Sequence, residues 1–296
     1  PSKYSEFRKY LIKNYPEILK FRDEKIYMED FEHLSPKEFA AEILLNTMDK
    51  VDGEDWENFE DALAHIDFSS KFPVPNHKEN ETEEEDNDLM KDYLLYMDML
   101  TNGFISCTKW WQMLFQNWIR EVQIPIKICN YDCKKNLKGL FQENEMLFFS
   151  FNYTKTLEKI YGIKDVTHIH NYVGQKLVFG HGEDNATYEP QGSDLLLSSS
   201  FLDDMVMAFR KDTDFAMIRC KKFFQKLTPN INKVYSYGFS YGKVDNVYIK
   251  RIINSSSPDT KWHFTEFEAR DLEALRIKKI KLRNYGFKGT FDIFEG

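Results

Sequence analysis

Two histidines separated by one residue, His168 and His170, follow an apolar run that stops at Asn152 in the segment FFSFNYTKTLEKIYGIKDVTHIHNYVG, residues 148–174. An imidazole group titrates near neutral pH, so it can take up or release a proton under physiological conditions. Because side chains alternate along a strand, both histidines lie on one face of the predicted strand, with His168 one pleat deeper. The residue types therefore permit acid–base chemistry at the end of this segment.

The same residue types are also common in structural roles. Asn152 and Thr154 are favoured at helix N-caps, and a pair of strand histidines is more often hydrogen-bonded within the protein than catalytic. Gly180 in the sequence GHG and Gly238 in the sequence YGFS are also ordinary turn residues. Taken one at a time, these features favour the structural interpretation.

A metal site built from these histidines is a minor alternative. It would use His168, His170 and His181, but the nearby carboxylates, Asp165 and Glu183, have no recognised ligand spacing. The four cysteines are too few and too scattered for a disulfide framework or a structural zinc site. We therefore expect free thiols and no bound metal.

The elements that must bring these residues together alternate along the second half of the chain. Apolar runs typical of strands are separated by helical patterns. The sequences of these apolar runs are MLFFSF, VTHIH, KLVFG, KVYSYGFS and KWHFTEF. This alternation predicts a Rossmann-like α/β fold with a parallel sheet, in which the carboxyl ends of the strands share one edge. We therefore predict that Asn152 and His170 end neighbouring strands and face one another across a cleft, which Gly238 and Ser240 also reach.

A mostly helical region, residues 1–142, is predicted to be a large insertion that packs on the α/β core of residues 143–296. Amphipathic patterns predict helices near Ser5, after Ser35 and Pro36, and near Trp56. An acidic stretch with two prolines, about 72–88, predicts a loop. A long helical pattern over 88–122 follows it, with a predicted break at Gly103.

The composition limits the classes of function. The chain has 296 residues, 40 basic and 48 acidic, and a net charge of −8, which disfavours nucleic acid as a partner. There is no signal-peptide pattern, and no apolar run approaches the roughly 20 residues that cross a bilayer. We therefore expect a cytoplasmic protein that does not bind membranes. The basic run RIKKIKLR, 276–283, leaves a nuclease as a weak alternative, although such a run is usually the solvated face of a helix.

Six segments, in chain order, resemble the bacteriophage abortive-infection AbiH family: PSKYSEFRKYL, WENFEDAL, FFSFNYTKTLEKIYG, THIHN, LVFGHG and YSYGFSYGKVDNVY. The resemblance spans nearly the whole chain and implies a role in bacterial defence against phage, by harming or arresting the infected cell. That family in turn resembles the sirtuin-like NAD-binding proteins, and many defence proteins of this type destroy NAD. The resemblance thus implies NAD as a substrate and a glycohydrolase type of reaction.

Residue roles follow from this resemblance by position. Asn152 matches the sirtuin-type asparagine that orients water or substrate, and His170 matches the base. Gly238 and Ser240 match a later loop on the ribose side of the nucleotide. The implied nucleotide-binding set also includes Thr154, His168, Gly180 and Asp245.

The sequence departs from the family pattern at three points. Asn171 stands where a glycine usually follows the paired histidines, and Thr154 stands where an aspartate often follows the sirtuin-type asparagine. A strand with a GNGFD-like phosphate loop normally precedes the KYSEF helix, so we expect such a segment upstream of Pro1. The zinc ligands of sirtuin deacetylases are also missing from the sequence, which argues against protein deacylation.

A second interpretation is a binding or toxin module that recognises a phage or host component without catalysis. The long aromatic helix and the acidic loop motivate it. Under either interpretation we expect a phage-derived trigger or a host protein as a partner, and assembly into a homo-oligomer or a complex.

Overall fold

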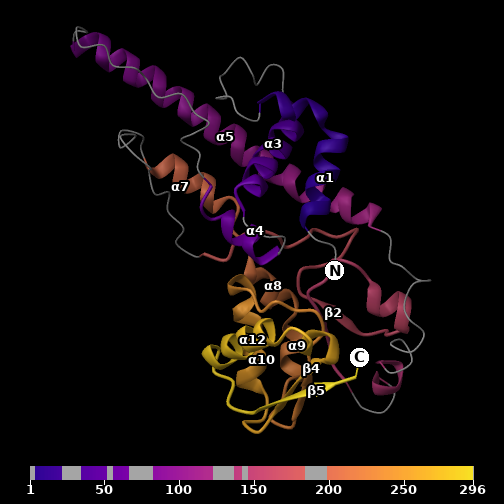
Figure 1. Ribbon diagram of the computed structural model, residues 1–296. Helices are drawn as coiled ribbons and strands as arrows, with labels where there is room; N and C mark the ends of the chain where they lie inside the picture. The colour runs from indigo at the N-terminus through magenta and orange to yellow at the C-terminus, as the bar shows by residue number, and fades with distance from the viewer. Residues whose placement is uncertain are drawn as a thin grey trace. The chain divides into compact units, whose positions relative to one another are not determined.

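The computed structural model describes residues 4–21, 35–51, 56–66, 83–122, 137–141, 146–183 and 199–295 (Figure 1). The chain divides into two compact units. Apart from Pro1, the sheet unit comprises Ile119–Val178 and Asp212–Gly296, and the helical unit comprises Ser2–Trp118 and Phe179–Lys211. These units differ from the predicted division, 1–142 and 143–296, in the placement of segments 119–142 and 179–211.

The fold is mixed α/β and mostly helical, with two small parallel sheets. The first sheet pairs β1 (Phe148–Ser150) with β2 (Val166–His168). The second has the order β3 (Lys233–Tyr235), β4 (Lys261–Thr265) and β5 (Thr290–Phe294). The parallel pairing is as predicted, but the described strands form two sheets where the sequence predicts a single Rossmann-like sheet.

The helices of the sheet unit connect its strands. They are η2 (Leu157–Tyr161, a π-helical turn), α8 (Thr213–Arg219), α9 (Lys221–Lys226), η3 (Lys243–Asp245), α10 (Asn246–Ser255), α11 (Glu266–Ala269) and α12 (Leu272–Asn284). The side chain of Thr265 caps α11, and that of Asp271 caps α12, because each accepts from an amide of the first turn. The helical patterns predicted between the strands are confirmed, but α11 begins at Glu266, inside the segment KWHFTEF that was predicted as a strand.

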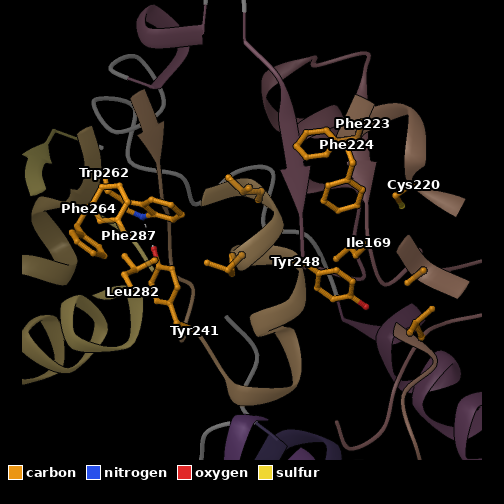
Figure 2. Packing of buried hydrophobic residues seen from close by; sticks show 14 of the residues in the cluster. Ile169, Cys220, Phe223, Phe224, Tyr241, Tyr248, Trp262, Phe264, Leu282 and Phe287 are labelled. Carbon is orange, nitrogen blue, oxygen red and sulfur yellow. Dashed lines mark hydrogen bonds between the residues drawn. The ribbon is translucent and has the colours of Figure 1, made fainter. Parts of the chain in front are cut away.

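The core of the sheet unit is rich in aromatic side chains (Figure 2). Alternation along β4 buries Trp262 and Phe264 in it, while His263 lies on the opposite face of the strand. Tyr241 and Tyr248 have no exposed surface. Cys220 is also part of the core, and burial raises the pKa of its thiol. This core holds the loops that follow β2 and β3.

The helical unit has its own aromatic core. Its elements are α1 (Tyr4–Asn14), η1 (Pro16–Phe21), α3 (Pro36–Asp49), α4 (Trp56–Ala62), most of α5 (Glu83–Glu121) and α7 (Ser199–Met207). Ser35 caps α3 through a reciprocal capping box with Glu38, as the Ser-Pro start predicts. Phe115 of α5 stacks on Phe179 with ring centroids 4.8 Å apart. Phe179, from the second half of the chain, thus packs against a helix of the first half.

Helix α5 corrects two predictions. It runs without interruption for 39 residues, so Gly103 does not break it, and residues 83–88 are helical rather than part of a loop. A glycine inside a helix costs only about 1 kcal/mol relative to alanine, which the surrounding residues readily offset. The rest of the predicted acidic loop lies outside the described residues.

Two strand predictions also differ from the structure. The segment KLVFG forms no strand, and only the isolated bridge between His181 and Arg210 follows it. The sequence pattern did not predict β5, which pairs with β4 over its whole length. Buried and exposed side chains do not alternate regularly along β5, and the apolar Ile293 is 47% exposed.

Candidate functional site

The carboxyl ends of β1 and β2 lie side by side. Their parallel register pairs Ser150 with His168, and the N–H of Ile169 donates to the carbonyl of Ser150 at 3.1 Å. Asn152 and His170 each lie two residues beyond this last pair, so both strands end earlier than predicted. β2 ends in a turn in which Asn171 takes a φ of 61° and its N–H donates to the carbonyl of His168.

His170 forms a buried pair with Asp245. Nε2 lies 3.0 Å from Oδ1, and the two side chains are only 4% and 10% exposed. An ionised carboxylate only accepts hydrogen bonds, so in a neutral His170 the proton sits on Nε2 and the lone pair on Nδ1. Asp245 occupies the N-cap of α10, where an aspartate usually caps the first turn, yet its side chain makes no capping hydrogen bond. The carboxylate therefore hydrogen-bonds to His170 and does not cap the helix.

Aromatic rings surround this pair. The ring of Tyr153 stacks near His170 with centroids 5.6 Å apart, and the rings of Phe151 and Tyr248 approach at 5.7 and 6.0 Å in edge orientations. Hydrogen bonds also fix the backbone at His170. The N–H of Val178 donates to the carbonyl of His170, and the Tyr153 hydroxyl donates to the carbonyl of Val178. These contacts hold the imidazole in one orientation.

His168 has partners within the chain on both ring nitrogens. Nδ1 lies 3.0 Å from the carbonyl oxygen of Asn152, and Nε2 lies 2.9 Å from Oε1 of Glu158. Glu158 belongs to the π-helical turn η2, whose C-cap, Gly162, has the left-handed conformation common at helix ends. The imidazole of His168 thus joins the end of β1 to the turn that crosses over to β2.

Asn152 and Thr154 do not cap this turn. The residue at the N-cap of η2 is Thr156, and it makes no capping hydrogen bond. The side chain of Asn152 is exposed, while its N–H donates to Oγ of Ser150 at 3.2 Å. Thr154 is half-buried, with its hydroxyl 2.9 Å from that of Thr156. The N-cap explanation for Asn152 is therefore wrong, and its amide is exposed at the end of β1.

The loop after β3 also reaches this region of the sheet unit. Gly238 takes a φ of 63°, and both it and Ser240 are exposed. The ring of Phe239 between them stacks on Phe151 with centroids 4.0 Å apart and planes inclined by 25°. Since Phe151 directly precedes Asn152, this contact connects the loop to the end of β1.

The same loop, GFSYG, matches the G-x-S-x-G pattern of hydrolase nucleophile elbows. In an elbow, the serine itself lies on a sharp, strained turn between strand and helix. Here the positive φ angles belong to Gly238 and Tyr241, and α10 begins only at Asn246. The hydroxyl of Ser240 makes no hydrogen bond within the described part of the chain. The loop geometry therefore does not support a serine nucleophile.

Gly180 belongs to the helical unit, whereas the other predicted site residues belong to the sheet unit. Its φ is 139°, and a Cβ placed on it would lie 2.0 Å from the carbonyl oxygen of Phe209. The N–H of His181 donates to that carbonyl, and the N–H of Lys211 donates to the carbonyl of His181. A glycine is needed here because another segment of the same chain approaches its backbone closely.

Replacing Gly180 with alanine is expected to destabilise the protein by about 2–3 kcal/mol, because the new methyl group forces Phe209 away at a φ that side chains rarely adopt. Urea unfolding measures this loss. Gly174→Ala is the matched control, since Gly174 has a φ of 100° but nothing within 4 Å of an added Cβ. Equal losses in both variants would show that the close approach at Phe209 has no separate effect.

The three-histidine metal site has no support in the described part of the chain. His181 is completely buried, its Nε2 lies 2.9 Å from the carbonyl oxygen of Val206, and burial lowers its pKa. Over the residues that the structure describes, no group of three or more His, Cys, Asp or Glu side chains could hold a metal ion. Among the helices that the structure describes, none combines the length and the hydropathy of a membrane-spanning segment.

Sequence reasoning missed two residues at this site. Glu158, the partner of His168, lies in the crossover segment and had no distinguishing motif. Tyr153 directly follows Asn152, but nothing in the sequence indicates that its ring stacks near His170. Asp245 was among the predicted residues, but not as the partner of His170, which lies 75 residues away in the chain. Its position at the start of a predicted helix after a strand was the available signal.

The model of the family described as "Bacteriophage abortive infection AbiH" matches residues 1–266, a range that includes every residue of the candidate site. No curated protein and no solved structure matches the chain. The chain therefore belongs to the AbiH family of bacteriophage abortive-infection proteins, and its role lies in abortive infection.

Proposed function

We propose that this protein acts in abortive infection by hydrolysing NAD, and that the ends of β1 and β2, together with the loop after β3, form a sirtuin-type binding framework of a Rossmann-like core. The observation that carries the proposal is the buried pair of His170 and Asp245 directly after β2. An aspartate whose carboxylate hydrogen-bonds an imidazole, instead of capping its own helix, is the arrangement expected of a positioned general base. Loss of NAD from the cytoplasm would arrest the infected cell before phage replication is complete.

In this reaction, residues of the sheet unit activate the water molecule and stabilise the charge that forms. His170 takes a proton from a water molecule through Nδ1, while Asp245 accepts the hydrogen on Nε2 and stabilises the imidazolium that forms. The water oxygen bonds to C1′ of the ribose, the bond from C1′ to the nicotinamide nitrogen breaks, and its electron pair leaves with the nicotinamide. The products are nicotinamide, ADP-ribose and one proton.

The positions of Asn152 and of the loop after β3 support this assignment. The exposed amide of Asn152 can donate and accept hydrogen bonds, so it can orient the water or the nicotinamide amide. Gly238 and Ser240 lie exposed beside Phe239, which stacks on Phe151 next to Asn152. In this proposal the loop contacts the ribose side of the nucleotide.

Purified protein incubated with NAD tests the proposal. Nicotinamide and ADP-ribose should appear in equal amounts, either spontaneously or after addition of lysate from phage-infected cells as a source of the trigger. The experiment should be repeated without divalent metals, since the proposed mechanism uses none. If NAD is neither bound nor consumed under any of these conditions, the enzymatic proposal is wrong.

A second candidate function is recognition of a phage or host protein without catalysis. The observation that favours it is a set of exposed large aliphatic side chains on α5: Leu94, Leu95, Met99 and Ile105. Exposed apolar side chains on a helix are a common means of binding partners. The double change Leu95→Ser and Met99→Ser should then abolish phage protection, while His170→Ala should leave it intact. The opposite pattern favours the catalytic proposal.

A further inference from the structure

Tyr241 has an unusual backbone conformation. Its φ is 59°, in the left-handed region, although its side chain is a large aromatic ring with no exposed surface. A bulky residue rarely adopts this conformation, and it persists only where the surrounding structure holds it in place. Such outliers occur preferentially at functional sites, so the contacts of Tyr241 are informative.

Three hydrogen bonds fix this residue. The Tyr241 hydroxyl donates to Oγ of Ser236 at 2.6 Å and accepts from the indole N–H of Trp262 at 2.8 Å. The Tyr285 hydroxyl donates to the Tyr241 carbonyl at 3.0 Å. Figure 2 shows the Tyr241 side chain pointing toward Trp262 within the core. Burial raises the pKa of Tyr241, so its hydroxyl stays protonated and can make both of its bonds.

These bonds close the loop between β3 and η3. Ser236 directly follows β3 and Tyr241 lies near the end of the loop, so the bond between their side chains joins the two ends. The loop residues between them include the exposed Gly238 and Ser240, and the ring of Phe239, which contacts both Phe151 and the ring of Tyr241. The buried end of the loop is thus fixed while its tip remains accessible.

We infer that Tyr241 is a positioning residue that holds loop Ser236–Gly242 in its ligand-binding shape before any ligand arrives. The inference rests on the proposed function only for the identity of the ligand, a nicotinamide nucleotide. A preformed loop avoids the entropy of ordering on binding, so loss of Tyr241's bonds should weaken nucleotide binding more than it slows the chemical step. Tyr241 itself lies in the core and need not touch the ligand.

Chymotrypsin measures the loop directly, because Tyr237 is 62% exposed and both Tyr237 and Phe239 are residues after which this protease cleaves. Tyr241→Phe keeps the ring and removes the hydroxyl with its two hydrogen bonds. We expect cleavage after Tyr237 or Phe239, followed by mass spectrometry of the fragments, to become about tenfold faster. The KM for NAD should rise about tenfold, while kcat changes less than twofold.

Two further variants make the test decisive. Ile252→Val, in the same core but outside the loop, provides a matched loss of stability and should leave both the cleavage pattern and KM unchanged. Tyr285→Phe removes the bond to the Tyr241 carbonyl and keeps the Tyr241 hydroxyl, so it should give a smaller increase in the same cleavage. It keeps the inference testable if Tyr241→Phe does not fold.

Unchanged cleavage in both Tyr241→Phe and Tyr285→Phe overturns the inference, whatever the result with NAD. Faster cleavage in a protein that does not consume NAD would instead sustain the role of Tyr241 and refute the proposed reaction. Failure of the inference and failure of the proposed function are therefore distinguishable.

Discussion

Replacing Asp245 with asparagine is expected to lower the rate of nicotinamide release by a factor of about 10²–10⁴, the usual contribution of a positioned general base. The carboxylate accepts the hydrogen on Nε2 of His170. An asparagine amide can instead donate its own hydrogen to Nε2, and the imidazole proton then moves to Nδ1. The nitrogen that should take the proton from water is no longer basic, although the shape of the site is nearly unchanged.

The same unit offers a matched control. His263 also has a carboxylate neighbour, with its Nδ1 3.8 Å from Oδ2 of Asp292, and the Asp292 side chain is 53% exposed. Asp292→Asn should therefore leave NAD cleavage within about twofold of the original rate, since exposed charge pairs contribute little. Thermal unfolding of both variants checks that neither effect comes from loss of the fold.

A double variant tests whether His170 and Asp245 act as one group. His170→Ala alone should lower the rate as much as Asp245→Asn does, and the combined variant should be no slower than either one. Residues that act as a unit show this lack of additivity. If Asp245→Asn keeps the original rate while His170→Ala loses it, Asp245 has only a structural role.

The sequence predicted the juxtaposition of β1 and β2 because it depends on a local rule. Two apolar runs with one short crossover between them form neighbouring parallel strands, so Asn152 and His170 follow paired strand ends. The end of β2 was not predictable in the same way. It depends on Asn171, whose left-handed backbone ends the strand, and asparagine enters that region only in some contexts.

Longer-range features of the site depend on packing that no local pattern encodes. The bond between His170 and Asp245 joins segments 75 residues apart, and the ring contact between Phe151 and Phe239 also crosses from one strand end to another. Gly180 is another case. The sequence suggests a turn residue or a nucleotide contact there, and no local pattern indicates that the backbone of Phe209 approaches it closely.

The second large effect concerns the stability of the helical unit. Nζ of Lys211 lies 2.9 Å from Oε1 of Glu60, and the two side chains are 0% and 10% exposed. Lys211→Met is expected to lower the free energy of unfolding by about 3–5 kcal/mol, because it leaves a buried carboxylate without its ammonium group. Urea unfolding followed by tryptophan fluorescence measures the loss.

The expected loss of stability comes from the burial of the two charges rather than from ion pairing itself. Two comparisons distinguish burial from ion pairing. Lys226 and Asp165 form a pair with the same 2.9 Å separation, but their side chains are 52% and 82% exposed, so Lys226→Met should cost less than about 1 kcal/mol. The double change Lys211→Met and Glu60→Leu removes both buried charges and should recover most of the stability lost by Lys211→Met alone. If the double variant is instead as unstable as the sum of the single variants, the two charges do not compensate one another, and the lysine stabilises the helical unit through other contacts.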